Sequence, residues 1–401
     1  MTREQITNDC LAAIDSSKCL LTLLSTGVGK TKITIDCINK ICDKVFSREN
    51  DRTDVLIVVD KKVHIQNWKD EFEKWGGINT DNVEFCCYAS LHKYARSYWD
   101  VVVLDECHHV GSEVRLEALE TINIAYNLIG LSATVSRELK TWFKRKYKTA
   151  IVTCTTQDAM ESDILPEPII YLMPLILNDK YYTELYEINK KDKTTPVQHG
   201  DYKDLWVLKR SKKHAFIRCT QRQYLNELDG LVNFYKRKAA GGSTTMKNLW
   251  LRACGDRLTY LANAKNKQVQ AILTKLKNYR TITFCTSIEQ SEKLGKNCIH
   301  SKNKAAQETL NSFNAGKIKH ITACHMLNEG VNLTNCKYGI FANINASETI
   351  QVQRVGRALR HKDPILIIPF FRDTREEELV RKWMENYNKD LIKVIYRPDD
   401  L

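Results

Sequence analysis

The sequence predicts an α/β fold with two parallel-sheet domains in tandem and a basic helical insertion between them. Strand-length runs of Val, Ile and Leu alternate with helix-length segments through residues 1–150, which is typical of a parallel sheet buried on both faces. The same alternation returns from Thr281 onward. Between these stretches the strand pattern fades and basic helical patterns replace it, so the insertion is placed there.

The first domain, residues 1–160, has a glycine-rich turn between its first predicted strand and the helix that follows. We predict strands over Leu20–Leu24, Val55–Val59, Val83–Tyr88, Val101–Leu104 and Ala125–Leu131. Apolar residues recur at helical spacing over Lys32–Val45 and Val63–Trp75, which predicts two helices.

The insertion, residues 161–268, begins near Pro166 and Pro168, which disfavour a helix. Apolar residues then recur at helical spacing over His214–Lys238 and again over Leu249–Leu261. The second domain covers residues 269–401, with a closing helix around Thr374–Asn388. Its predicted strands are Thr281–Cys285, Ile318–Ala323, Tyr338–Ala342 and Ile365–Phe370.

The charge of the chain favours a polyanionic partner. The 401 residues carry a formal net charge of +13 and give a pI near 9.0. Lys203–Lys247 alone contains eleven Lys and Arg against three acidic residues. A solvated helix with its aromatic side chains in the core is the alternative interpretation of this segment. The residues predicted to contact nucleic-acid phosphates are Lys209, Arg210, Lys212, Lys213, Arg218, Lys236, Arg237 and Lys238.

The cysteines and the N-terminus bear on the cell compartment. Fourteen cysteines without a C-x-x-C pair indicate buried reduced thiols rather than zinc ligands. The N-terminus lacks an apolar signal-type core, and the longest apolar runs are only strand-sized. We therefore expect a cytoplasmic protein, in the host-cell cytoplasm if the source is viral, with no membrane partner.

A glycine-rich segment, Ser25–Thr31, lies where the first strand meets its helix. Glycine lets backbone amides turn toward phosphate oxygens, and the helix N-terminus adds positive potential. Lys30 would neutralise the β- and γ-phosphates of a nucleotide, and Thr31 would offer its hydroxyl to Mg²⁺. Leu24 stands where the full phosphate-loop pattern has glycine, and a tight turn with an exposed lysine is the alternative. The predicted nucleotide cradle consists of Thr26, Gly27, Val28, Gly29, Lys30 and Thr31.

Two carboxylates follow the apolar strand Val101–Leu104. Asp105 and Glu106 are therefore expected at the sheet edge where ligands of open α/β sheets bind. Asp105 would hold Mg²⁺, and Glu106 would orient and deprotonate an attacking water. A solvated helix N-cap is the alternative interpretation of this pair.

Three polar residues near the C-terminus share one predicted helix face. Gln353, Arg357 and Arg360 are spaced i, i+4 and i+7. A guanidinium fork matches phosphate oxygens and can stabilise charge on a phosphoryl group in transfer. An ordinary basic surface helix is the alternative.

Taken in order, these motifs resemble those of superfamily 2 helicases and translocases of the DExH type. The resemblance implies two RecA-like domains that bind ATP and Mg²⁺ between them and couple hydrolysis to movement on nucleic acid. The matching segments are Thr26–Thr31, Leu56–Phe72, Asp105–His108, Ser132–Thr134, Thr281–Ser287, Glu329–Leu333 and Gln353–Arg360.

The resemblance also implies a role for each matching residue. Gln5 corresponds to a glutamine that contacts the adenine base. Gly330 and Asn332 correspond to a segment that contacts the nucleotide. Many members carry aspartate at the position of Asn332. The segment Leu56–Phe72 resembles the segment with which members of the family contact a nucleic-acid strand. Positions that couple the domains correspond to His108, Ser132 and Thr134. Catalytic positions correspond to Lys30, Asp105, Glu106, Gln353, Arg357 and Arg360.

The residues of two motifs favour DNA over RNA as the substrate. Asp-Glu-Cys-His-His together with Gln-Arg-Val-Gly-Arg-Ala-Leu-Arg is more similar to DNA-directed members, such as phage recombination helicases, RecG-like fork remodellers and Swi/Snf-like translocases. We expect a monomeric ATP-dependent helicase or translocase that acts on duplex or branched DNA in repair or recombination. An RNA helicase, or a clamp that binds nucleic acid without hydrolysing ATP, are the alternatives.

Overall fold

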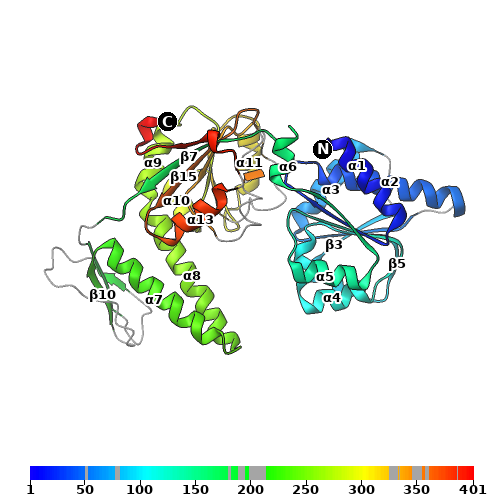
Figure 1. Cartoon of the computed structure of the whole chain (residues 1–401), viewed down its shortest axis with the longest axis horizontal. Coiled ribbons are helices and arrows are strands. Elements are labelled where there is room, and N and C mark those ends of the chain that lie inside the picture. Colours follow the sequence, from blue (N-terminus) through cyan, green and yellow to red (C-terminus); the bar gives the residue numbers. More distant parts are fainter. Residues whose placement is uncertain are drawn as a thin grey trace. The chain divides into compact units, whose positions relative to one another are not determined.

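The computed structural model describes residues 1–49, 53–76, 82–178, 182–187, 195–197, 214–324, 333, 335–345, 355–356, 361–385 and 387–401. Within these, the side chains of residues 47–49, 182–187, 195–197 and 214–219 are not described. The chain forms two compact units (Figure 1). The first comprises Met1–Ile169, Met326–Lys337 and Ser347–Ile365, and the second comprises Ile170–His325, Tyr338–Ala346 and Leu366–Leu401.

The first unit contains a six-stranded parallel sheet in the order β3-β2-β4-β5-β1-β6. Every residue of β1 and β2 is buried, as expected of strands covered on both faces. The strands are β1 (Cys19–Leu24), β2 (Val55–Val59), β3 (Val83–Cys87), β4 (Tyr98–Leu104), β5 (Asn123–Ser132) and β6 (Thr149–Cys154).

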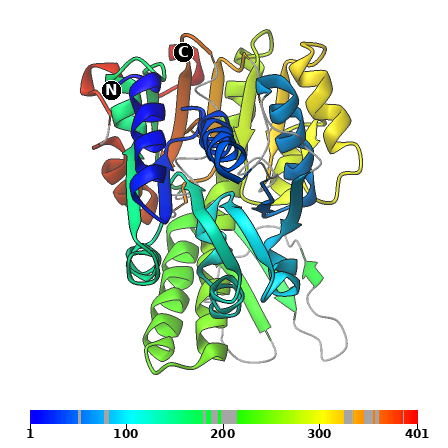
Figure 2. The same cartoon turned by 90° about the vertical axis from the view of Figure 1, so that its right-hand side faces the viewer.

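Helices cover both faces of this sheet (Figures 1 and 2). On one face, Leu119, Leu139 and Phe143 pack against strand residues such as Val102 and Leu128. The helices are α1 (Arg3–Ser16), α2 (Lys30–Glu49), α3 (Lys62–Trp75), α4 (Glu113–Glu120), α5 (Arg137–Lys146) and α6 (Thr156–Glu161), with 3-10 helices η2 (Tyr88–Tyr94) and η3 (Cys107–Gly111).

The second unit is built on a seven-stranded sheet in the order β12-β13-β11-β14-β15-β7-β16. The pairs β12–β13, β13–β11, β11–β14 and β7–β16 are parallel. The strands are β7 (Ile169–Leu175), β11 (Thr281–Phe284), β12 (Cys298–Ile299), β13 (His320–Ala323), β14 (Tyr338–Phe341), β15 (Ile365–Phe371) and β16 (Ile392–Val394). The helices are α9 (Asn266–Lys275), α10 (Ile288–Leu294), α11 (Ala306–Asn314) and α13 (Arg375–Met384), with 3-10 helices η5 (Lys389–Leu391) and η6 (Pro398–Asp400).

Between β7 and α9 the chain forms a small sheet and a helical hairpin. The antiparallel strands β8 (Tyr182–Glu187), β9 (Thr195–Val197) and β10 (His214–Cys219) pair in the order β10-β8-β9. The helices α7 (Gln221–Ala239) and α8 (Thr244–Ala264) lie side by side in both views (Figures 1 and 2).

The helix predicted over His214–Lys238 begins later than the sequence pattern indicates. Residues 214–219 form β10 instead, because β8 provides hydrogen-bonding partners for their backbone groups. Helix α7 starts at Gln221, where the Thr220 side chain accepts from Gln223 N in a capping box. The insertion is therefore mixed α and β rather than helical throughout.

Two parallel-sheet α/β domains in tandem are confirmed, whereas the boundaries 1–160, 161–268 and 269–401 stay a prediction. The cysteines whose side chains are described are free thiols, and most of them are buried. Within the described residues, each helix is too short or too polar to cross a lipid bilayer.

Candidate nucleotide-binding site

The loop between β1 and α2 adopts a backbone that requires glycine. Gly27 has φ 99° and Gly29 has φ 110°, a region that residues with a Cβ atom rarely occupy. A Cβ atom on Gly27 would also lie 3.0 Å from Leu165 Cδ2. The loop therefore turns directly from a buried strand into a helix N-terminus, which is a ready site for an anion.

A cavity of about 670 Å³ opens beside this loop, within the first unit. Its volume falls in the range of small-molecule sites. Two predicted nucleotide contacts, Val28 and Gln5, are not among the lining residues. Val28 is buried, and the Gln5 side chain accepts from the amide of Thr2, the N-cap of α1. The lining residues that the sequence predicted are Thr26, Gly27, Gly29, Lys30, Thr31, Asp105 and Glu106.

Lys30, the first residue of α2, provides a buried positive charge in this cavity. Its side chain is only 13% exposed, and its Nζ lies 3.7 Å from Glu106 Oε1. Nζ has no hydrogen-bond partner in the part of the chain that the structure describes. An ammonium group has three donors and is costly to bury unsatisfied, so this position is suited to an anionic ligand.

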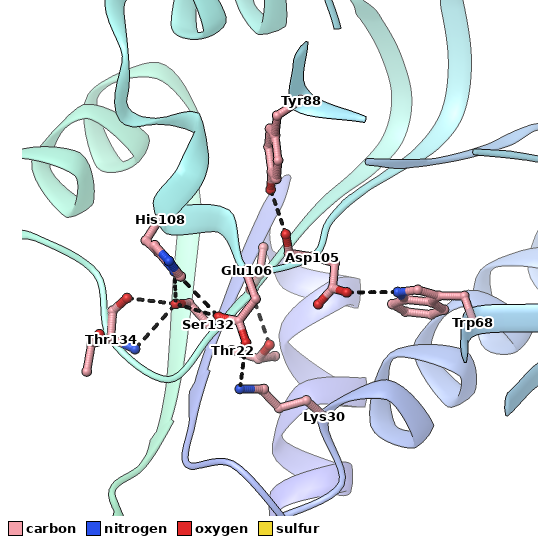
Figure 3. Close-up of polar contacts among 10 residues, drawn as sticks. Thr22, Lys30, Trp68, Tyr88, Asp105, Glu106, His108, Ser132 and Thr134 are labelled. Atoms are coloured by element: carbon pink, nitrogen blue, oxygen red, sulfur yellow. Dashed lines mark hydrogen bonds and ion pairs between the residues drawn. The ribbon is translucent and has the colours of Figure 1, made fainter. Parts of the chain in front are cut away.

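Asp105 is held at both its backbone and its side chain (Figure 3). Its amide donates to Val58 O at 2.9 Å, and the Tyr88 hydroxyl donates to its carbonyl at 2.9 Å. The Trp68 indole N–H donates to Asp105 Oδ2 at 3.0 Å. Burial and the neighbouring Glu106 carboxylate raise the pKa of Asp105 to about 6, although Trp68 and Lys30 act in the opposite direction. Two adjacent carboxyl groups of this kind are suited to a divalent cation.

Glu106 turns the chain sharply after β4. Its backbone lies in the left-handed region, with φ 49° and ψ 57°. For a residue other than glycine this conformation costs about 1–2 kcal/mol and tends to occur at functional sites.

Two of the three residues predicted to couple the domains, His108 and Ser132, lie beside the Glu106 carboxylate, and the third, Thr134, contacts Ser132 (Figure 3). His108 Nδ1 lies 3.0 Å from Ser132 Oγ and 3.4 Å from Glu106 Oε2. Ser132 Oγ donates to Thr134 O at 2.7 Å and lies 3.4 Å from Glu106 Oε2. The end of β5 is thereby connected to Glu106 through a short polar network.

Several predicted site residues lie outside the described residues. The Arg218 side chain is among them, although its backbone pairs with Thr183 between β10 and β8. The others are Lys209, Arg210, Lys212, Lys213, Gly330, Asn332, Gln353, Arg357 and Arg360.

Two residues of the predicted arginine segment, Gln353–Arg360, are described, Val355 and Gly356. Gly356 belongs to the first unit by its contacts, and a Cβ atom placed on it would lie 2.6 Å from Thr26 Cβ. The backbone at position 356 therefore packs against the phosphate loop closely enough to require glycine.

The structure also places residues in the site that the sequence did not single out for this role. Trp68 and Tyr88 hold Asp105, and Arg3 lines the cavity. The buried stripe His64, Trp68 and Phe72 on α3 was visible as helical spacing, but nothing in that spacing showed which residue would reach Asp105.

Comparisons with known proteins agree with this fold. Residues 2–137 match the family model described as "Type III restriction enzyme, res subunit", and residues 264–362 match "Helicase conserved C-terminal domain". A DNA 3'-5' translocase XPB2 from Sulfurisphaera tokodaii is 22% identical over 390 residues, which cover 90% of this chain and 80% of the relative.

Two solved structures have a similar fold. A fragment of an HsdR subunit of a type I restriction enzyme from Vibrio vulnificus has a TM-score of 0.58 at 15% identity, covering 99% of this chain and 68% of that chain. The Hef helicase domain of Pyrococcus furiosus has a TM-score of 0.50 at 14% identity, covering 94% and 97%.

The two sheets with a phosphate loop define a tandem RecA-like protein. The chain belongs to the superfamily 2 helicases and translocases, which are ATP-dependent enzymes.

Proposed function

We propose that the protein hydrolyses ATP in the cavity beside the phosphate loop and uses that hydrolysis to move along DNA. The observation that carries this proposal is the buried Lys30 ammonium, which has no hydrogen-bond partner among the described residues and faces the cavity with the two carboxylates. A triphosphate supplies the acceptors that this ammonium lacks.

The chemistry assigned to the site is phosphoryl transfer to water. The Lys30 ammonium and the amides of the glycine loop bind the phosphate oxygens. Glu106 orients a water and accepts its proton as the water oxygen bonds to the γ-phosphorus. The bond from that phosphorus to the bridging oxygen breaks, and ADP leaves with the electron pair. His108 and Ser132 keep the Glu106 carboxylate oriented.

The donor set fits Mg²⁺. Asp105 and Thr31 supply a carboxylate and a hydroxyl, which are hard oxygen ligands, and both line the cavity. When bound, Mg²⁺ would offset negative charge on the phosphate oxygens. We assign Asp105 and Thr31 to hold it.

The arginine segment is proposed to complete the site. Arg357 directly follows Gly356, whose backbone packs against Thr26 of the phosphate loop. Guanidinium groups from Arg357 and Arg360 would supply further positive charge to the γ-phosphate, and Gln353 would sense it. Gln5, Gly330 and Asn332 remain proposed nucleotide contacts on the family resemblance.

DNA is proposed as the polymer because the relative from Sulfurisphaera tokodaii is named a DNA translocase. The excess of basic residues supports a phosphate backbone as the partner. Lys236, Arg237 and Lys238 are exposed in the last turn of α7, where they could contact phosphates.

The test is ATP hydrolysis measured with a panel of duplex DNA, forks, Holliday junctions, single strands and RNA. We expect the largest stimulation by duplex or branched DNA. Greatest stimulation by RNA would replace the proposal with an RNA helicase. Nucleic-acid binding without any stimulated phosphate release would replace it with a non-hydrolysing clamp.

Two lysine variants in α2 test whether ATP is hydrolysed in this cavity. Lys30→Ala should lower turnover at least about 100-fold, because it removes a preorganised charge on the transferring group. Lys44→Ala is the matched control, since Lys44 lies on the same helix and pairs with Asp15 at 3.4 Å. Turnover of Lys30→Ala within threefold of the wild type would exclude the proposed site.

A further inference from the structure

Trp68 connects α3 to the carboxylate at the end of β4. Its side chain is 2% exposed and its indole N–H donates to Asp105 Oδ2 at 3.0 Å (Figure 3). Trp68 and Asp105 are 37 residues apart in the sequence and both line the cavity. The contact therefore belongs to the site itself.

The position of the indole is fixed by the packing of α3. His64, Trp68 and Phe72 form the buried stripe of this helix, spaced four residues apart. The rings of Trp68 and Phe72 pack with centroids 5.7 Å apart. Because the ring is buried and packed, its N–H points at Asp105 without freedom to turn away.

The chemistry of indole suits this contact. Indole N–H is a donor only, so it can bond one carboxylate oxygen but cannot compete for a cation or accept a proton. A hydrogen bond to a charged acceptor is stronger than one between neutral groups. With the Asp105 carbonyl held by Tyr88, the bond from Trp68 leaves the carboxylate little freedom to rotate.

We propose that Trp68 is a positioning residue that holds the Asp105 carboxylate by Oδ2 and keeps its other oxygen directed to the Mg²⁺ of the bound nucleotide. The inference rests on the proposed function and assigns α3 a part in metal binding. The family resemblance had linked this segment, Leu56–Phe72, only to a nucleic-acid strand.

The test is the affinity of a fluorescent ADP analogue, measured against Mg²⁺ concentration and also in EDTA. Trp68→Phe keeps an aromatic ring in the core but lacks the donor. We expect the Mg²⁺ concentration at half-saturation to rise about tenfold, the lower end for a hydrogen bond to a charged group. Affinity in EDTA should stay within twofold, since the phosphate loop is untouched.

The control is Trp142→Phe, the same substitution on α5, where the ring packs on Phe143 and Tyr147. It should leave both affinities unchanged. A Trp68→Phe protein with wild-type Mg²⁺ dependence, or one that loses affinity equally in EDTA, overturns the inference. Absence of Mg²⁺-dependent binding in the wild type would instead refute the proposed function.

A second measurement keeps the wild-type tryptophan and so does not depend on the fold of Trp68→Phe. Indole N–H resonances of the seven tryptophans are recorded in full-length protein labelled with ¹⁵N-tryptophan. Because Trp75 also lines the cavity, the Trp68 resonance is identified as the one that moves in Asp105→Ala, and that resonance should shift on addition of Mg²⁺ and ADP. Failure of Asp105→Ala to move any indole resonance would contradict the contact.

Discussion

Glu106 combines a strained backbone with a side chain surrounded by partners. Its left-handed conformation is unfavourable for glutamate, yet its carboxylate meets Lys30, His108 and Ser132. The sequence identified these residues by type and order, because strand ends in a parallel sheet bring them to one edge. It did not identify Trp68 or Tyr88, because their contacts depend on side-chain directions that a residue pattern does not contain.

A comparison of two variants at position 106, glycine and alanine, separates the effect of backbone strain on stability from the effect of the lost side-chain contacts. Both Glu106→Gly and Glu106→Ala remove the carboxylate, so both should abolish turnover. Glycine accepts φ 49° without strain, and we expect the glycine variant to be more stable than the alanine variant by about 1 kcal/mol. Urea unfolding of the two variants measures the difference. An alanine variant as stable as the glycine variant would show that the turn relaxes.

Among the elements, the buried strands are those that the sequence predicts best. The predicted bounds of β2 match the structure, because a fully buried parallel strand must be an uninterrupted apolar run. Strand β10 was mistaken for helix, since the short apolar run Ala215–Ile217 does not by its periodicity distinguish a strand from a helix. Strand β16 has only three residues and depends on pairing with β7, which no local pattern encodes. Gln353, Arg357 and Arg360 lie outside the described residues, so their part in the site stays a prediction.

A buried ion pair joins the α8–α9 junction to α13. Lys265 Nζ lies 2.6 Å from Glu376 Oε1, and the two side chains are 0% and 2% exposed. Glu376 Oε2 also accepts from Phe371 N at 3.1 Å. Lys265→Met should destabilise the second unit by about 3–5 kcal/mol, because it leaves a buried carboxylate without its partner.

The double variant tests that explanation. Lys265→Met combined with Glu376→Gln removes both charges while the amide oxygen can still accept from Phe371 N. We expect it to recover more than half of the stability lost in Lys265→Met, measured by urea unfolding. A double variant less stable than Lys265→Met would contradict the account.

His320, the first residue of β13, makes stability depend on pH. Burial lowers its pKa from 6.5 to about 4. The unfolded chain therefore binds the proton more tightly, and stability should fall as the pH drops from about 6.5 to 4, by at most about 3 kcal/mol. Thermal unfolding at pH 7 and pH 5 measures this loss, which His320→Asn should reduce. An equal loss in the variant would assign the pH dependence to other groups.

At the scale of the molecule, the positive charge is distributed unevenly. The sequence places eleven basic residues between Lys203 and Lys247, and part of that segment forms the hairpin of α7 and α8. Composition could predict a polyanionic partner. It could not predict which basic residues contact that partner, because those contacts depend on the positions of the hairpin and its flanking segments. Within this segment, the basic residues whose side chains the structure describes are Arg222, Lys236, Arg237, Lys238 and Lys247.

Three basic residues at the end of α7 are expected to bind DNA phosphates. Lys236, Arg237 and Lys238 replaced together by alanine should make the salt dependence of duplex DNA affinity less steep, by about 0.9 in log–log slope for each phosphate that the variant no longer neutralises. The measurement is binding to labelled duplex at several salt concentrations.

A matched control exists at the end of α5. The alanine triple variant of Lys144, Arg145 and Lys146 changes the net charge equally and also alters the last turn of a helix. We expect it to leave the slope unchanged. The same change in slope for both triple variants would indicate a general effect of net charge and not a contact surface.

The indole of Trp68 gives the protein an intrinsic optical reporter. Its N–H is bonded to Asp105, so its emission depends on the charge and position of that carboxyl group. Occupation of the cavity should therefore change the wavelength of tryptophan fluorescence, and the change should be smaller in Trp68→Phe, in which Trp75 still lines the cavity. Unlabelled nucleotide and unmodified protein would then suffice to follow the filling and emptying of the site in real time.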